Sequence, residues 1–361
     1  MDDATRPRER MRSHRLTAPA ADPVAAARHM LATQAQEFWG GRWALAVRSS
    51  RAPGLSRLDA AFDDGRLVRS WTMRGTIHIC PAEDLGWLLG ITGERQLRSA
   101  ASRHRQLEID ADARRRAERA VRSALRGGGR LTRAEVAGVL ERVGERTAGQ
   151  RGLHLLQSLS LRGIVCHGPV VPRPGAVTRE QYIVLSEEWI TDPVTPVDPL
   201  AELFVRYIDG HGPATAADFA WWTGLPLGVA RTAAAAAEGR VTVADHDVPL
   251  YASIRAPRPD PRRPEVVALP AFDEYYISYA DRSAAATTAH RALIGPGANG
   301  MVRPTILVRG RIVGVWTHSR AVGRDDAAAR AELFPAASGA DPVDEVAVRA
   351  ALDRYAEFIR G

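Results

Sequence analysis

The chain has 361 residues, 45% of them hydrophobic, and a formal net charge of +7 at pH 7, which together predict two to three globular domains with a sizeable core. All 49 Lys+Arg positions are arginine, which excludes a Walker A phosphate loop, a pyridoxal phosphate Schiff base and a lysine nucleophile. The basic balance favours an anionic partner, most often nucleic acid, although a GC-rich genome also enriches a protein in arginine.

The first twenty residues are basic and lack the apolar segment of a signal peptide. We expect residues 1–20 to form a disordered basic arm. No apolar run in the chain approaches the roughly 18 residues that a membrane-spanning helix needs. The sequence therefore predicts a cytoplasmic protein with no membrane partner.

Two glutamines stand close together after the first amphipathic helical pattern, which covers residues 22–32. Gln34 and Gln36 flank one alanine and precede an aromatic-glycine turn. Residues two apart on an α-helix point about 200° away from each other. The two amides therefore share a face only if the helix ends there or the backbone is irregular. They either cap a helix end or hold a reacting group by neutral hydrogen bonds.

Residues 71–80 read as a strand or wing, and the following Pro81 and two acids open a helix. Arg74 and Gly75 stand where a wing tip or strand bend would bring an arginine near a phosphate. The alternative is an ordinary surface arginine.

The middle of the chain predicts a compact module. Residues 113–126, 131–144 and 149–163 have helical patterns, and two strands joined by a Pro/Gly loop follow within residues 164–185. Three helices and a two-stranded wing are the order of a winged-helix module. Residues 199–252 repeat this order.

The second predicted helix also starts in the same way in both copies. In "GGRLTRAEVAGVL" and "HGPATAADFAWWT" a turn, a threonine cap, an acid and apolar residues follow in register. Thr132 with Glu135 forms a capping-box pattern. An earlier copy would run from the glutamine helix to the strand "TIHIC".

A proline-rich linker, residues 255–264, precedes the last part of the chain. Alternation around Arg309 and Gly310 predicts strand, turn and strand, and a terminal helix closes the chain. The predicted domains are a disordered arm (1–20), three winged helices (21–110, 111–192 and 193–256) and a β-rich domain with a terminal helix (257–361).

Other residues carry less functional signal. The histidines have no metal-ligand spacing, so we expect no metal and no cofactor. Cys80 and Cys166 lie in separate apolar runs and read as core residues of strands. The run "FDEYYISYADR" combines three tyrosines with Asp273, Glu274 and Asp281. These acids either pair arginines structurally or work in a site, and we favour the structural role.

Four segments together resemble one known family. "LATQAQEF", "SWTMRGTIHICPAEDL", "ALPAFDEYYISYADR" and "NGMVRPTILVRGRIVGVW" are similar, in order from about residue 26 to 320, to the AlkZ/YcaQ winged-helix DNA glycosylases. The resemblance implies a mainly α (α+β) fold of three tandem winged-helix modules with a small C-terminal β-barrel-like domain around duplex DNA. Members remove bulky or crosslinking N7-alkylguanines, and several act as self-resistance enzymes for DNA-alkylating natural products.

The resemblance also assigns the glutamines. The family motif is glutamine, an apolar residue, then glutamine or aspartate, so Gln34 and Gln36 resemble the AlkZ branch and are the candidate catalytic residues. An N7-alkylated guanine is cationic and leaves without a general acid. A glutamine carbonyl can stabilise the oxocarbenium-like sugar, and an amide pair can hold the attacking water. Candidate DNA contacts are Arg74, Arg42, Tyr275 and Arg282.

The sequence thus predicts a monofunctional DNA glycosylase, a hydrolase of N-glycosyl bonds in alkylated double-stranded DNA, acting as a monomer at the nucleoid. The alternative is a non-catalytic winged-helix transcriptional regulator. The glutamine pair separates the two, because a regulator has no need of amides facing a sugar.

Overall fold

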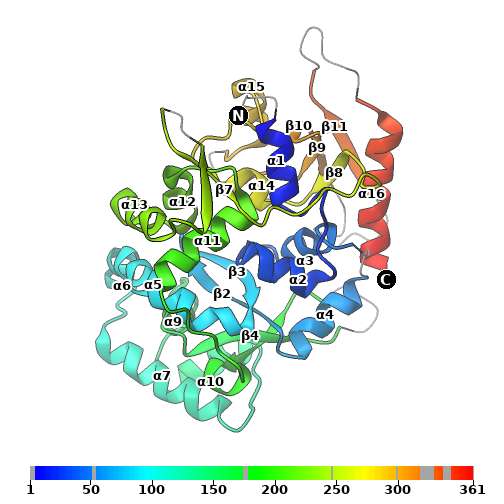
Figure 1. The fold of residues 1–361 in the computed structure, drawn as a ribbon. Coiled ribbons are helices and arrows are strands. Elements are labelled where there is room, and N and C mark those ends of the chain that lie inside the picture. The colour runs from blue at the N-terminus through cyan, green and yellow to red at the C-terminus, as the bar shows by residue number, and fades with distance from the viewer. Residues whose placement is uncertain are drawn as a thin grey trace. The chain divides into compact units, whose positions relative to one another are not determined.

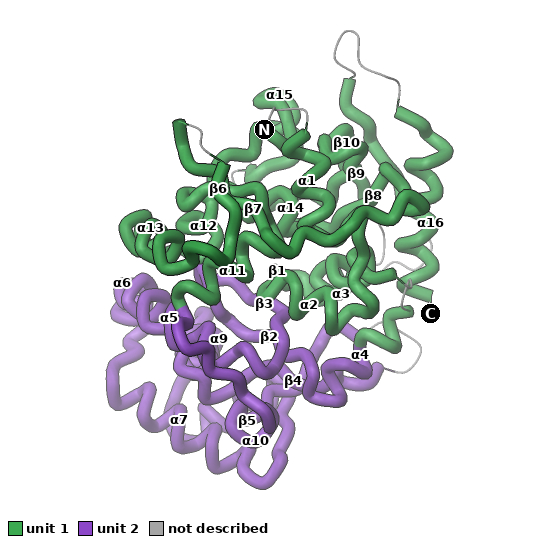
Figure 2. Tube along the Cα trace, viewed as in Figure 1, with its two compact units in different colours: residues 1–58, 200–361 green, residues 59–199 purple. Residues whose placement is uncertain are grey.

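The computed structural model forms two compact units of α+β structure (Figures 1 and 2). Unit 1 comprises residues 1–58 and 200–361, whereas unit 2 is the single segment 59–199. The residues described by the structure are 5–50, 54–173, 178–244, 247–297, 300–317, 329–335 and 343–360.

The chain begins with a packed helix, α1 (Arg6–Ser13). Met11 is buried in the core of unit 1, and the Arg10 guanidinium lies 3.6 Å from the centre of the Tyr279 ring. The expectation that residues 1–20 form a disordered arm is therefore wrong from residue 5 onward. The first four residues lie outside the described part. The packing partners are more than 200 residues away in sequence, so local composition did not indicate them.

Short elements complete the N-terminal part of unit 1, and the last of them crosses into unit 2. They are α2 (Pro23–Met30), β1 (Thr33–Gln34), α3 (Phe38–Val47) and α4 (Leu55–Asp63).

Unit 2 is built on antiparallel strands in the order β3-β2-β4-β5. The strands are β2 (Leu67–Met73), β3 (Thr76–Pro81), β4 (Val165–Val170) and β5 (Gln181–Leu185). The helices are η1 (Ala82–Asp84), α5 (Leu85–Ser99), α6 (Ala101–Gln106), α7 (Ala111–Leu125), α8 (Arg133–Arg142), α9 (Arg151–Leu161) and α10 (Ser186–Trp189).

Residues 71–80, expected to form a strand or wing, lie in the two strands of the β2–β3 hairpin. The turn between β2 and β3 is Arg74-Gly75, with φ of 53° and 72°. Two positive φ values are what a type I′ hairpin turn requires, and its twist matches that of the flanking strands. Strand β2 also pairs with β4, so the predicted domain boundary at residue 110 falls inside unit 2.

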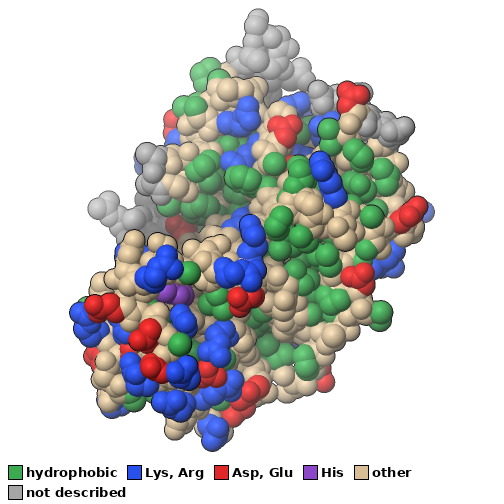
Figure 3. Space-filling model, turned by 90° about the vertical axis from the view of Figure 1, so that its left-hand side faces the viewer, with side chains coloured by type: hydrophobic (Ala, Val, Ile, Leu, Met, Phe, Trp, Pro, Cys, Tyr) green, Lys and Arg blue, Asp and Glu red, His purple; other side chains and the backbone are tan. Residues whose placement is uncertain are grey.

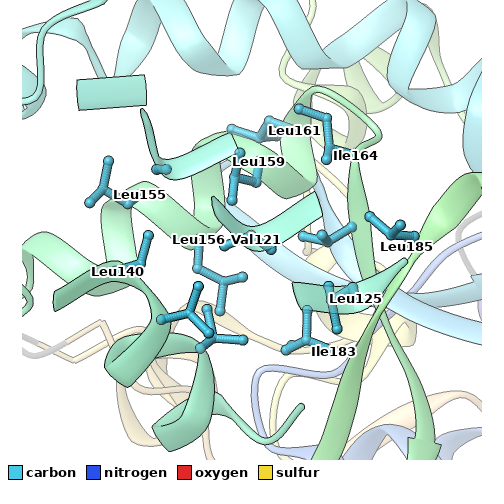
Figure 4. Packing of buried hydrophobic residues seen from close by; sticks show 14 of the residues in the cluster. Val121, Leu125, Leu140, Leu155, Leu156, Leu159, Leu161, Ile164, Ile183 and Leu185 are labelled. Atoms are coloured by element: carbon cyan, nitrogen blue, oxygen red, sulfur yellow. The ribbon is translucent and has the colours of Figure 1, made fainter. Parts of the chain in front are cut away.

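A hydrophobic core holds the helices of unit 2 against its sheet (Figure 4). Helix α7 contributes Val121 and Leu125 at i, i+4 spacing, and both are fully buried. Helix α9 contributes Leu155, Leu156 and Leu159 to the same cluster. Burying one such side chain stabilises the fold by about 1.5–3 kcal/mol.

The second part of unit 1 is a helical segment followed by a sheet. The helical segment contains α11 (Pro199–His211), α12 (Ala216–Thr223), α13 (Leu227–Ala236), β6 (Val241–Ala244) and β7 (Leu250–Ser253). The remaining elements are β8 (Val266–Leu269), α14 (Glu274–Ile277), α15 (Thr288–Ile294), β9 (Thr305–Val308), β10 (Arg311–Thr317), β11 (Arg330–Leu333) and α16 (Glu345–Arg360).

The repeat predicted from the sequence is present in the order and capping of the elements. The segments α7–β5 and α11–β7 each run helix, helix, helix, strand, strand. Both second helices begin with a capping box, Thr132 with Glu135 and Thr215 with Asp218. In each copy the residue before the cap also bridges to the last strand, in the pairs Leu131↔Ile183 and Ala214↔Tyr251.

The C-terminal sheet is open in the part that the structure describes. Its antiparallel order is β11-β10-β9-β8, and α16 packs against β8 (Figure 1). The β-rich character is present, but a barrel-like closure of this domain is not confirmed. The predicted turn between β9 and β10 is confirmed at Arg309 and Gly310, both with positive φ.

The cysteines are confirmed as core residues of strands. Cys80 lies in β3 and Cys166 in β4, both are buried free thiols, and burial raises the pKa of Cys166 to about 12. Across the described ranges, none of the helices combines the length and apolar character needed to cross a membrane.

Candidate active site

The glutamine pair lies in a connector between helices. Helix α2 ends at Met30, Leu31 adopts φ 62°, and Gln34 lies in the short strand β1. Residues two apart in extended backbone can share a face, which they cannot do in a regular helix. Gln34 is 8% exposed, whereas Gln36 is exposed at a bend just before α3.

A buried carboxylate holds the backbone of this motif. The main-chain N–H of Gln34 donates to Oε1 of Glu274 at 2.7 Å. Oε2 accepts from Trp222 Nε1 at 3.1 Å and from the Ser278 hydroxyl. Glu274 is fully buried, and a charge in such a place requires hydrogen bonds of this kind. The three donors therefore fix the carboxylate, and the carboxylate fixes Gln34.

His211 adds a fourth group to this carboxylate. Its Nδ1 lies 3.0 Å from the Tyr207 carbonyl, which only accepts, so Nδ1 carries a proton. Its Nε2 lies 3.9 Å from Oε2 of Glu274. The ring stacks on Tyr207 with centroids 4.7 Å apart. The site therefore places a buried imidazole beside the carboxylate that anchors the motif.

A second histidine is held neutral nearby. The Tyr279 hydroxyl donates to the His211 carbonyl at 2.7 Å, so His14 Nε2, 2.7 Å from the same hydroxyl, acts as the donor. His14 Nδ1 is then the acceptor that faces Arg48 Nη2 at 3.4 Å. Burial, and next the charges of His211 and Arg48, lower the pKa of His14 well below its usual value.

Two acids of "FDEYYISYADR", Asp273 and Glu274, have different partners. Asp273 forms a buried two-point ion pair with Arg48, at 2.7 and 2.9 Å, and caps the amide of Tyr275. The favoured structural role, pairing an arginine, is confirmed for Asp273. Glu274 instead reaches the glutamine motif, which sequence reasoning did not indicate.

Two of the predicted DNA contacts are buried. Arg42 is fully buried in α3, with its guanidinium 4.1 Å from the centre of the Phe38 ring. Tyr275 is 1% exposed, and its hydroxyl lies 3.0 and 2.8 Å from the carbonyls of Pro7 and Gly310. Both side chains are buried inside unit 1 and contact other residues of that unit. Neither is placed to reach a phosphate, so we do not retain them as DNA contacts.

The other two predicted contacts are partly exposed. Arg74 is at the tip of the β2–β3 hairpin of unit 2, with Nη2 3.5 Å from His78 Nε2. Arg282 lies over the rings of Tyr276 and Trp221 in unit 1, at 4.9 and 5.4 Å. Gln34, Gln36 and Arg282 thus lie in unit 1, whereas Arg74 lies in unit 2.

Trp221 and Trp222 were missed by sequence reasoning. Trp222 is fully buried and binds Glu274, whereas its neighbour Trp221 is 47% exposed beneath Arg282. Adjacent helical residues differ by about 100° in direction, so one tryptophan of such a pair can face solvent. An exposed indole beside an arginine offers a stacking surface for a base.

The described residues contain no group of three or more His, Cys, Asp or Glu side chains that could hold a metal ion.

Comparisons with known proteins agree with this architecture. The family model "DNA glycosylase AlkZ-like" matches residues 27–358. Among solved structures, the chain is similar to the Streptomyces sahachiroi DNA glycosylase AlkZ, with a TM-score of 0.77 at 20% identity. That match covers 98% of this chain and 95% of the other. No curated protein sequence matches significantly. On the family match over most of its length, the chain belongs to the AlkZ-like DNA glycosylase family.

Proposed function

We propose that this protein is a monofunctional glycosylase that hydrolyses the N-glycosidic bond of bulky or crosslinked N7-alkylguanines in duplex DNA. Its role is repair or self-resistance against DNA-alkylating natural products. It acts as a cytoplasmic, nucleoid-associated monomer. Gln34 and Gln36 form the reaction centre.

The proposed chemistry suits neutral side chains. Alkylation at N7 gives the base a positive charge, so it leaves without protonation. The sugar gains oxocarbenium character as the bond breaks, and the carbonyl oxygen of an amide stabilises that charge. Two amides also position a water molecule for attack at C1′.

One observation carries this assignment: the hydrogen bond from the main-chain N–H of Gln34 to the buried carboxylate of Glu274. A motif that only capped a helix end would not require a buried carboxylate from a distant segment to hold its backbone. A fixed backbone limits the positions that the side-chain amide of Gln34 can take. Such preorganisation is the source of electrostatic catalysis. The exposure of Gln36 leaves that side chain within reach of a substrate.

The repeated segments supply the proposed means of binding. We assign α7–β5 and α11–β7 as winged-helix modules. The segment from α2 to β3 is assigned as a third, because it has the same order except for the short strand β1 after its first helix. Arg74, in the third module, and Arg282, which follows α14 in the C-terminal part of unit 1, are the proposed DNA contacts. Trp221 of α12 is the proposed stacking surface beside Arg282.

The test is excision from a duplex that carries a defined N7-alkylguanine, followed by alkaline cleavage at abasic sites. We expect strand scission at the alkylated position only after treatment with the protein. A matched duplex without the adduct is the control. Intact strands after prolonged incubation with active, folded protein would refute the proposal.

A further inference from the structure

Unit 2 carries an open groove, about 610 Å³ in volume, that takes no part in the site described above. Its walls come from the second half of α5, from α6, from the start of α7 and from α9. Figure 3 shows basic side chains gathered on the lower part of one face, interspersed with acids. The charged residues of this basic groove are Arg98, Arg105, Arg114, Arg115 and Arg162, against Glu94 and Asp110.

The two carboxylates of the basic groove are already engaged. Glu94 pairs with Arg98 at 3.4 Å. Asp110 caps α7 by accepting from the Ala113 amide at 2.7 Å, and this hydrogen bond lowers its pKa. Among the described residues, neither Arg105 nor Arg114 forms an ion pair with a carboxylate. Arg115 and Arg162 pair with Asp112 and Glu118, so the positive charge available to a ligand is that of Arg105 and Arg114.

Two buried polar groups also line the groove. His104 is 3% and Ser158 is 1% exposed, and neither His104 Nε2 nor the Ser158 hydroxyl has a hydrogen-bond partner in the described structure. Buried polar groups are nearly always satisfied in native proteins, and each unsatisfied one costs about 1–3 kcal/mol. Burial lowers the pKa of His104, so its neutral ring can present Nε2–H as a donor.

These groups define the chemistry of a ligand that would fit the groove. Arginine is a pure donor, and a serine hydroxyl and Nε2–H complete a set of donors around one open space. A cation would be repelled and an apolar group would leave the donors unsatisfied. An anion with several acceptor oxygens fits, and phosphate is the type for which arginine clusters are best suited.

We propose that the basic groove binds a phosphate of the DNA backbone. The inference rests on the proposed action on duplex DNA and adds a second contact surface, on unit 2. The expected contact is independent of sequence and of damage, since a phosphate carries no base information.

The first test is binding of a short undamaged duplex, measured by fluorescence anisotropy over a series of salt concentrations. Wild type is compared with the double variant Arg105→Ala/Arg114→Ala. The matched control is Arg126→Ala/Arg142→Ala, which removes two exposed arginines of unit 2 that lie outside the groove. The groove variant should bind about tenfold more weakly, with a log–log salt slope smaller by about 1–2. Equal losses in the two double variants would overturn the proposal.

The second test uses Ser158→Ala. Because the hydroxyl has no protein partner, its removal should leave the melting temperature unchanged or raised, while duplex affinity falls about threefold or more. A residue with only a structural role would lower stability and leave affinity unchanged. Wild-type affinity in Ser158→Ala would show that the hydroxyl does not contact the ligand and would count against the site.

Stabilisation of the protein by added inorganic phosphate distinguishes free phosphate from the DNA backbone as the ligand of the groove. If the groove served free phosphate, the arginine double variant would lose stabilisation by phosphate but bind duplex like wild type, and the DNA assignment would be wrong. Excision assays on the same proteins separate the two proposals. Weaker duplex binding by the groove variant, with no excision by wild type, would refute the proposed function alone.

Discussion

The backbone amide of Gln34 donates a 2.7 Å hydrogen bond to Glu274, a residue 240 positions later in the chain. The bond joins the motif that the family resemblance singles out to the acidic tyrosine-rich segment of the C-terminal half. The carboxylate is fully buried and also accepts from Trp222 and Ser278. Glu274 is therefore a positioning residue for the proposed reaction centre.

Replacing Glu274 by glutamine should test this role. The amide oxygen can still accept from Gln34, but its NH₂ group then faces the Trp222 and Ser278 donors. We expect excision at saturating duplex to fall about tenfold or more, with duplex affinity unchanged, because the motif loses its fixed geometry. Trp222→Phe, which removes one donor and keeps the charge, should show a smaller fall. Single-turnover excision measures both, and melting curves verify folding. Wild-type rates in folded Glu274→Gln would contradict the assignment.

The glutamines themselves should matter for rate and not for binding. Gln34→Ala and Gln36→Ala should each lower excision by about 10²-fold or more, the scale of losing one transition-state dipole. Gln36→Asp should keep part of the activity if that position holds water, since a carboxylate also accepts. The measurement is excision of N7-alkylguanine with binding assayed in parallel. Two fully active alanine variants would remove the motif from the mechanism.

Turnover should leave the DNA strand intact and never linked to the protein. Glycosylases that also nick the strand use an amine that forms a Schiff base, and this chain has no lysine. Arginine stays protonated and does not attack the sugar. Borohydride reduction during turnover should therefore trap no covalent adduct. An adduct in good yield would exclude water as the nucleophile.

The buried Arg48–Asp273 pair should dominate local stability. Asp273→Asn keeps the cap on Tyr275 but leaves a buried, uncompensated guanidinium, so we expect a loss of about 3–5 kcal/mol in the free energy of unfolding. The matched control is Glu265→Gln in the half-exposed pair with Arg309, where the change should stay within about 1 kcal/mol. Urea unfolding at neutral pH compares the two. Similar losses at both sites would show that burial does not set the strength of these pairs.

Acid should destabilise the protein through its buried histidines. Burial, and next the charge of Arg69, lower the pKa of His167 to about 3, whereas the unfolded chain has a value near 6.5. Between these values the unfolded state binds a proton that the folded state does not, so stability falls as the pH falls. His167 should account for about 2 kcal/mol between about pH 7 and about pH 5.

The check is urea unfolding of wild type and His167→Gln at both pH values. The neutral glutamine should reduce the pH dependence by that amount. Burial also lowers the pKa values of His14 and His78, so part of the slope should remain in the variant. An unchanged slope would show that His167 takes up its proton without unfolding.

Local signals in the sequence were sufficient for much of the secondary structure. The capping boxes at Thr132 and Thr215, and the hairpin turn at Arg309, depend on neighbours within a few residues. The repeat could be predicted because it copies such local signals in register. Helical geometry also indicated that a shared face for the two glutamines needs a helix end or an irregular backbone, and α2 ends at Met30, before the pair.

Contacts between distant segments could not be predicted in this way. The apolar residues of α1 are too few to show a period, and their partners lie in the last third of the chain. Burial of Arg42 depends on packing around α3, although its run "FWGGRWALAV" is otherwise apolar and indicates a buried helix. Nothing near Glu274 in sequence indicates that its carboxylate accepts from Gln34, since that contact depends on the completed fold of unit 1.

The discontinuity of unit 1 has a consequence for synthesis on the ribosome. Unit 2 is one continuous segment, so it can collapse soon after residue 199 emerges, whereas residues 1–58 must wait for residues 200–361 before their core exists. At about 5–20 residues per second, translating the intervening unit takes on the order of 10–30 s. During that time Met11 and the other apolar residues of the N-terminal segment lack their partners. The nascent chain should depend on chaperones in this interval more than a protein whose domains follow one another in sequence.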